Sequence, residues 1–248
     1  MVSFSFVRIN VLGAVLWTAG ILAFVPQVLS ALHWPVSYSY RHNLISDLGV
    51  TRCGIFDEST RVERFICSPW HEVANLGTIA NGVILAVGAL LLWNAWPKRT
   101  IGRVAMFLFT VGGVLIIAVG VFPWDTHPEL HNLTAITQGL FQWVGMALLL
   151  ISIRKAKDLR VLWWLTLVSL AVSLAGFALF LNAVGGGFAA SLGLGLTERI
   201  AFDTLTIWGA AAGFLLLKAI MTNSGLAGNI NQPLLNSGTA HPQGLPTH

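Results

Sequence analysis

The chain has 248 residues, of which 55% are hydrophobic and only 10% are charged, and its net charge is +4. Its mean hydropathy of +0.75 excludes an ordinary soluble surface. The basic residues do not gather in one patch, so we expect no nucleic-acid partner. The composition therefore indicates an integral membrane protein.

Apolar runs recur along the chain, each long enough to cross a hydrocarbon core of about 30 Å as a helix of about 20 residues. There are six, over residues 11–32, 73–93, 104–122, 133–153, 162–181 and 200–220. The first is too long for the apolar core of a cleaved signal peptide, so we expect it to be retained. We predict an all-α membrane protein with a six-helix transmembrane domain over residues 1–221. The polar tail, residues 222–248, is expected to be disordered and cytoplasmic.

Most Lys and Arg residues lie near the termini or in alternate connections between the predicted helices. These are Arg8, Lys98, Arg99, Arg103, Arg154, Lys155, Lys157, Arg160 and Lys218. The positive-inside rule then places both termini and the second and fourth connections in the cytoplasm. The first, third and fifth loops are expected to be exoplasmic. We assign the two short basic connections no role beyond topology.

The first connection, residues 34–70, is far longer than a link between helices requires. It contains the two cysteines of the chain, Cys53 and Cys67, and an exoplasmic loop is where a disulfide is expected to form. Closing a loop of about 15 residues is worth roughly 3 kcal/mol. We predict a disulfide-pinned exoplasmic lid; two free thiols are the alternative.

Two of the predicted helices carry polar residues at steps of three or four, which places them on one face of each helix. The faces comprise His71, Asn75, Thr78 and Asn81; and His131, Thr134, Gln138 and Gln142. The last predicted helix carries Glu198, Arg199, Asp203 and Thr206, of which Arg199 and Asp203 are four apart and can pair. Lipid cannot satisfy such groups, so they must face protein or water. We predict a polar cavity between these helices that opens to the exoplasmic side. The alternative is that the groups only hydrogen-bond helices to one another.

Acid–base chemistry needs a group that titrates near neutral pH and a partner that orients it. We assign catalytic roles to His71, His131, Asp47 and Asp203. The residues expected to bind substrate lie at the same membrane face: Arg41, His42, Asn43, Ser46, Asn75, Gln138, Glu198 and Arg199. Arg199 is the proposed anchor for an anionic headgroup. For Asp47 the alternative is that its carboxylate accepts backbone hydrogen bonds in the SDLG turn.

Histidines and carboxylates near the exoplasmic mouth are candidate ligands for zinc or another divalent metal. The candidates are His71, His131, Asp125 and His127. Their spacing matches no known metal signature. Pro128 also disfavours a continuous helix that starts before His127, which weakens the His127–His131 pair as a metal motif.

Several motifs, taken together and in this order, resemble the "domain of unknown function 998" membrane family. They are RHNLISDLG (41–49), CSPWHEVAN (67–75), VGVFPWDT (119–126) and GLGLTERIAFDTLTIW (193–208). The resemblance implies a six-helix fold in a mainly prokaryotic family, and hence a bacterial inner (plasma) membrane. It supplies no mechanism. The SDLG element is more distantly similar to the Frag/DRAM/Sfk membrane proteins, some of which are linked to lipid remodelling or distribution.

We therefore expect a membrane protein that binds and chemically processes a lipid or isoprenoid-like amphipathic substrate at the exoplasmic face. One alternative is a non-enzymatic binder or transporter of a small amphipathic molecule, and another is a structural membrane protein. The expected partners are the lipid bilayer and the amphipathic molecule itself. The sequence leaves the oligomeric state open.

Overall fold

The structure is a computed structural model that describes residues 4–56 and 63–223. Within these residues, six helical spans are long and apolar enough to cross a membrane, as predicted. They are Arg8–Leu32, His71–Leu91, Arg99–Val121, Pro128–Ile153, Lys157–Val184 and Leu194–Thr222. The chain is thus a multi-pass membrane protein. The tail expected to be disordered lies outside the described residues from position 224 onward, and residues 222 and 223 still belong to the last helix.

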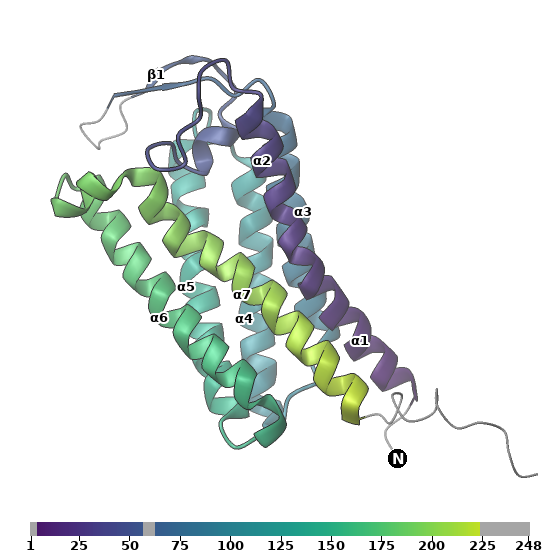
Figure 1. The fold of residues 1–248 in the computed structure, drawn as a ribbon. Helices are drawn as coiled ribbons and strands as arrows, with labels where there is room; N and C mark the ends of the chain where they lie inside the picture. The colour runs from purple at the N-terminus through teal and green to yellow at the C-terminus, as the bar shows by residue number, and fades with distance from the viewer. Residues whose placement is uncertain (1–3, 57–62, 224–248) are drawn as a thin grey trace, which may run out of the picture.

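The long helices form a closed ring. Their bounds are α1 (Phe4–Ala19), α3 (His71–Leu91), α4 (Arg99–Val121), α5 (Pro128–Ile153), α6 (Arg160–Val184) and α7 (Leu194–Asn223). Helix α3 packs against α1 and α4, α5 packs against α4 and α6, and α7 packs against α6 and α1 (Figure 1). Short 3-10 turns, η3 (Lys157–Leu159) and η4 (Phe188–Leu192), precede α6 and α7. This closed ring surrounds a single interior.

The first span is broken in two. Helix α1 passes through a 3-10 turn, η1 (Gly20–Ala23), into α2 (Phe24–Leu32). Pro26 explains the break, because proline has no N–H to donate to the carbonyl four residues earlier. A side chain at Gly77 of α3 would overlap the Pro26 ring. Glycine at position 77 thus lets α2 lie close against α3.

The long first connection forms a compact cap over one end of the ring. It contains a 3-10 turn, η2 (Ser46–Gly49), and two short antiparallel strands, β1 (Gly54–Phe56) and β2 (Arg64–Ile66). The predicted Cys53–Cys67 disulfide is confirmed and joins the residues that flank the hairpin. The structure is mostly helical, as predicted, and this hairpin is an addition to it. Its strands have only three residues each, too few for a periodic pattern. The cap lies at the opposite end of the ring from the start of α1 and the end of α7 (Figure 1).

Glycines allow close approach of α3 and α4. A Cβ at Gly82 would lie 2.5 Å from the carbonyl oxygen of Gly113, and one at Gly120 would lie 2.7 Å from that of Asn75. Backbone surfaces therefore meet along this pair of helices, which is how membrane helices gain packing contacts without a hydrophobic driving force. Helix α5 begins at Pro128, so His127 precedes the helix, as predicted.

An aromatic cluster fills the half of the ring nearer the termini. The rings of Trp17 and Trp208 each pack on Phe109, with centroids 5.5 and 5.1 Å away. Trp17 Nε1 donates to the Leu85 carbonyl at 3.2 Å, and Trp208 Nε1 donates to Thr166 Oγ1 at 3.0 Å. The indole N–H groups of Trp17 and Trp208 are thereby satisfied, and the rings fill this half of the interior.

Candidate functional site

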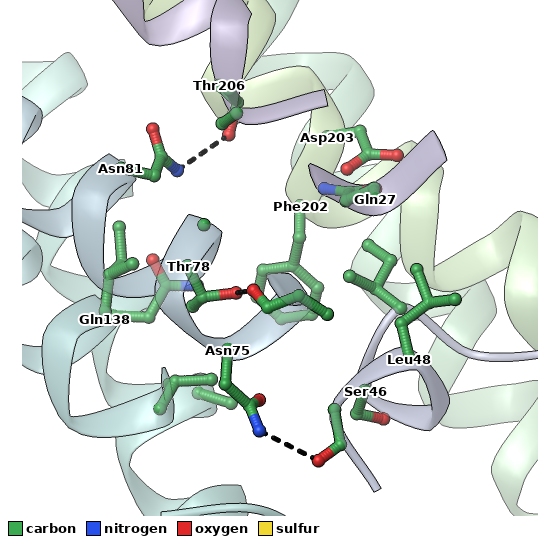
Figure 2. Close-up of a pocket in the computed structure, with 18 of the residues that line it drawn as sticks. Gln27, Ser46, Leu48, Asn75, Thr78, Asn81, Gln138, Phe202, Asp203 and Thr206 are labelled. Atoms are coloured by element: carbon green, nitrogen blue, oxygen red, sulfur yellow. Dashed lines mark hydrogen bonds between the residues drawn. The ribbon is translucent and has the colours of Figure 1, made fainter. Parts of the chain in front are cut away.

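A cavity of about 140 Å³ lies in the half of the ring nearer the cap. Its polar lining comes mainly from α3, α5 and α7, the three helices whose polar residues the sequence singles out, together with α2 and the first connection. The polar lining residues are Gln27, Ser46, Asn75, Thr78, Asn81, His131, Gln138, Gln142, Glu198, Asp203 and Thr206. Figure 2 shows Asn81 of α3 pointing toward Thr206 of α7, whereas the Asn75 amide points toward the first connection and Asp203 lies beside Gln27.

Hydrogen bonds join the residues that line the cavity on the side away from the cap. Asn81 Nδ2 donates to Thr206 Oγ1 at 3.4 Å, linking α3 to α7 (Figure 2). Gln142 donates to the side-chain oxygen of Gln138 one turn away. Beyond these residues the aromatic cluster begins, since Trp17, Asn81, Leu205 and Thr206 line one small adjoining void. On each of these helices, the residues that line the cavity therefore lie nearer the cap than the residues that pack in the aromatic cluster.

One end of the cavity is closed by the segment Leu44–Val50, here called the lid segment. Ile45, Ser46, Leu48 and Gly49 contribute to the lining. Asn75 Nδ2 donates to the Gly49 carbonyl at 3.0 Å (Figure 2), and Ser68 Oγ donates to the Leu48 carbonyl at 2.7 Å. Hydrogen bonds to its backbone carbonyl groups thus fix the lid segment to α3 and to Ser68.

Asp47 lies within the lid segment but does not line the cavity. Its carboxylate is 1% exposed and pairs with Arg64 of β2 at 3.0 Å. It also accepts the Leu44 N–H at 2.9 Å. These contacts match the alternative interpretation, in which Asp47 holds the turn. The backbone bond was foreseeable from the SDLG pattern; the pairing with Arg64 depends on the hairpin, which the pattern does not predict.

The first two charged residues of α7 have different surroundings. Glu198 lines the cavity, and its carboxylate accepts the Ile45 N–H of the lid segment. The Arg199 guanidinium donates to the Asn43 carbonyl at 2.9 Å and to the Tyr38 hydroxyl. Arg199 also lies 3.9 Å from Asp203, as their spacing of four predicts. Arg199 therefore ties the first connection to α7 and is absent from the cavity lining, whereas Asp203 belongs to it.

The start of α7 fits closely against the backbone of the first connection. Gly193 has φ +96°, a conformation that side chains rarely tolerate, and a Cβ at Gly195 would overlap the Asn43 carbonyl. The Leu196 N–H donates to the Arg41 carbonyl at 3.1 Å. The glycines of this segment thus serve the approach of two backbone segments.

Tyr38 is a further residue of this junction, and no pattern in the sequence pointed to it. Its hydroxyl donates to the Leu44 carbonyl at 2.8 Å. Burial raises the pKa of the Tyr38 phenol well above its ordinary value, so the hydroxyl keeps the proton that this bond requires. Its ring also lies 5.5 Å below the Arg199 guanidinium carbon, a cation–π contact.

The histidines proposed for catalysis or metal binding occupy separate places. His131 lines the cavity, and its Nδ1 is 2.8 Å from the Phe122 carbonyl. His71 lies outside the lining, with Nδ1 3.0 Å from the Ser68 carbonyl, and His127 is exposed. Asp125 accepts the Thr51 hydroxyl at 2.7 Å. Over residues 4–56 and 63–223, no three His, Cys, Asp or Glu side chains gather into a group that could hold a metal ion.

The remaining substrate-binding candidates of the first connection also lie outside the lining. Arg41 Nη2 donates to the Ser191 carbonyl at 2.7 Å, His42 is exposed, and Asn43 Oδ1 accepts the Ser39 N–H at 3.0 Å. Ser46, Asn75, Gln138 and Glu198 do line it. Gln27 was not among the candidates; Figure 2 shows its amide beside the Asp203 carboxylate. Its position directly after Pro26, where the first span breaks, is the signal that could have identified it.

Comparison with known protein families places this arrangement in a family. Residues 18–215 match the model of the family described as "Protein of unknown function (DUF998)". This stretch takes in the whole capping loop, the four middle spans and most of the first and last spans. Neither a comparison with curated proteins nor one with solved structures found a match. The chain therefore belongs to the DUF998 family of membrane proteins.

Proposed function

We propose that the protein binds the polar head of a lipid or isoprenoid-like amphipathic molecule in the cavity beneath the lid segment. The observation that carries the proposal is the lining itself, in which amides, hydroxyls and carboxylates from α2, α3, α5 and α7 converge on one space within the membrane spans. Polar groups inside a membrane are costly unless they face a cavity or one another. A ligand head that hydrogen-bonds them would offset that cost.

The size of the cavity supports a head rather than a whole lipid as its occupant. Its volume of about 140 Å³ is close to that of a dry engineered cavity of roughly 150 Å³ that holds one benzene molecule. A headgroup of several heavy atoms fits such a space, and any long apolar chain must extend beyond it. An amphipathic ligand of one small head and one or more chains has this shape.

The charge of the lining narrows the chemistry of the head. Glu198 and Asp203 contribute carboxylates, and no Lys or Arg is among the lining residues. Arg199, expected to anchor an anionic head, donates hydrogen bonds to the Tyr40 and Asn43 carbonyl groups of the first connection. An anionic head would therefore meet repulsion, whereas a hydroxyl- or amine-bearing head finds acceptors in the carboxylates and amide oxygens. We propose a neutral or cationic head.

We further propose that the cap and the cavity face the exoplasm of a bacterial inner membrane. The disulfide supports this orientation, since it belongs to an oxidising compartment. The basic residues support it too, because those of the α3–α4 and α5–α6 connections lie at the end of the ring opposite the cap (Figure 1). The ligand would then enter from the outer leaflet or from the exoplasmic water.

Chemical processing of the bound head is a second candidate, and His131 favours it. The Phe122 carbonyl can only accept a hydrogen bond, so Nδ1 of His131 carries a proton in this contact. In the neutral ring, Nε2 then holds the lone pair that a general base requires. Among the described histidines, His131 alone lines the cavity. It could take a proton from a head hydroxyl.

The binding proposal is tested with three single-chain probes added to the purified full chain in detergent. The probes are a monoacylglycerol, an alkylamine and a lysophosphatidic acid, which carry neutral, cationic and anionic heads. We expect saturable binding of the first two. Asp203→Asn should weaken alkylamine binding about tenfold, because a charge-assisted hydrogen bond is lost. Glu129→Gln, which removes an exposed carboxylate outside the lining, is the matched control. Binding that Asp203→Asn leaves unchanged would refute the proposed site.

The catalytic candidate is tested separately, by comparing the lipid composition of membranes that contain wild-type or variant protein. His131→Ala should abolish any turnover while the variant still binds the monoacylglycerol. His71→Ala should leave turnover intact because this residue lies outside the lining. Equal lipid compositions with wild type and His131→Ala would leave binding without chemistry as the function.

A further inference from the structure

At the end of the molecule opposite the cap, the connection between α5 and α6 forms a second pocket, of about 310 Å³. Its lining includes four basic side chains and two tryptophans: Arg154, Lys155, Lys157, Arg160, Trp163 and Trp164. No acidic residue is among the lining residues. The volume lies at the lower end of the range for small-ligand sites.

We propose that this pocket binds the phosphate headgroup of an anionic phospholipid. Four cations that face one space repel each other, and a phosphate between them would relieve that repulsion. The ion pairs seen among the described residues use none of these four side chains. The site is separate from the cavity and does not depend on the function proposed for it.

The position of the pocket relative to the membrane fits a lipid headgroup. The fifth span begins at Lys157, so the pocket lies where that helix leaves the hydrocarbon core. Trp164 is 52% exposed, and its ring meets that of Trp163 edge-on at 4.8 Å. Tryptophan favours this interfacial depth, and basic pockets between membrane helices on the cytoplasmic side bind anionic headgroups.

The start of α6 adds to the attraction. Arg160 opens this helix of 25 residues, whose first N–H groups have no partner within the helix. The positive end of the helix dipole therefore faces the same space as the four cations. Guanidinium groups at Arg154 and Arg160 can each bind two phosphate oxygens at once, which a lysine cannot.

The test is native mass spectrometry of the purified full chain, with phosphatidylglycerol or phosphatidylcholine added at equal concentration. We expect the wild type to retain one phosphatidylglycerol in preference to phosphatidylcholine. The double variant Arg154→Gln and Arg160→Gln should weaken phosphatidylglycerol binding by about tenfold or more, at about 1 kcal/mol for each basic residue. The matched control is Lys98→Gln with Arg99→Gln. It removes the same charge at the start of α4, which lies at the end of the molecule opposite the cap but outside the pocket, and it should leave binding unchanged.

Three results would overturn the proposal. Equal loss of binding in both double variants would indicate nonspecific surface charge, and an equal preference of the wild type for the two lipids would show no site. Displacement of the lipid by millimolar inorganic phosphate would indicate a free-phosphate site instead. If the arginine variant does not fold, Lys155→Gln with Lys157→Gln serves in its place. Asp203→Asn should not change phosphatidylglycerol binding, which keeps this test independent of the cavity.

Discussion

Three helices carry both a hollow, polar half and a solid, aromatic half of this molecule. Helix α3 lines the cavity from Ala74 to Asn81 and joins the packed core from Leu85 onward. Helix α7 does so up to Thr206 and then contributes Trp208 to the aromatic cluster. The packed half is held by contacts between helices. The hollow half is held by the first connection, whose contacts reach the ends of α3 and α7.

The difference teaches that the two halves depend on different interactions. In the packed half, ring contacts hold the helices without any loop. In the hollow half, the Asn81–Thr206 hydrogen bond joins α3 to α7. The first connection, held internally by the buried Asp47–Arg64 pair, hydrogen-bonds to both helices. We therefore expect two kinds of change to be the most damaging: the removal of buried polar side chains in the cap and the truncation of apolar side chains in the core.

The largest expected effect is that of Asp47→Ala in the cap. Removing this carboxylate breaks the buried ion pair and both hydrogen bonds from Arg64 to Asp47, and breaking a buried pair costs about 3 to 5 kcal/mol. The loss of stability is measured as the fraction of purified protein that remains folded after heating, which size-exclusion chromatography detects. Asp47→Asn keeps a side-chain acceptor for the Leu44 N–H and should cost less. A variant that melts like the wild type yet loses ligand binding would instead give Asp47 a direct role in the site.

Phe109→Ala should have the next largest effect, in the packed half. The ring is fully buried between Trp17 and Trp208, and its loss leaves a cavity. We expect a cost of about 3 kcal/mol, at the low end for such truncations, because lipid also solvates apolar side chains in the unfolded state. Phe107→Ala on the same helix removes a ring that is 53% exposed and should change the melting temperature little. Equal effects of the two variants would contradict the division into halves.

The smallest expected effect is that of Gly113→Ala at the α3–α4 contact. The new Cβ would lie 2.6 Å from the Gly82 carbonyl oxygen, so the helices must separate slightly. Overpacking of this kind costs about 1 to 3 kcal/mol. Gly209→Ala provides the control, since a Cβ there meets nothing within 4 Å. A stable Gly113→Ala protein would show that this helix pair tolerates separation.

Much of this arrangement follows from periodicity in the sequence. The length of the apolar runs predicts the spans. The steps of three between Asn75, Thr78 and Asn81 predict which side of α3 faces the cavity. Periodicity ends where the helices end, so it could not assign partners in the first connection. Asp47 meets Arg64 only because a three-residue strand brings them together.

Charge alone also could not distinguish the roles of neighbouring residues on α7. Glu198 and Arg199 are adjacent, yet one lines the cavity and the other binds carbonyl groups of the first connection. The difference lies in the path of residues 38–45, which is set by Gly193 and Gly195 and by the aromatic packing of Tyr38 and Tyr40. No short-range pattern encodes that path. The sequence also did not predict the basic pocket between α5 and α6. Its basic residues are equally typical of a connection that only sets the membrane topology.

The contacts of the capping loop differ in the length of chain that they span, and this orders its assembly. The hairpin, the disulfide and the Asp47–Arg64 pair all join residues within 34–70. They can form as soon as the first two spans have been inserted during synthesis, which proceeds from the N-terminus. The contacts of Glu198 and Arg199 with Ile45 and Asn43 span more than 150 positions. The cavity is therefore completed only when the last span is inserted, so it cannot form before synthesis is nearly finished.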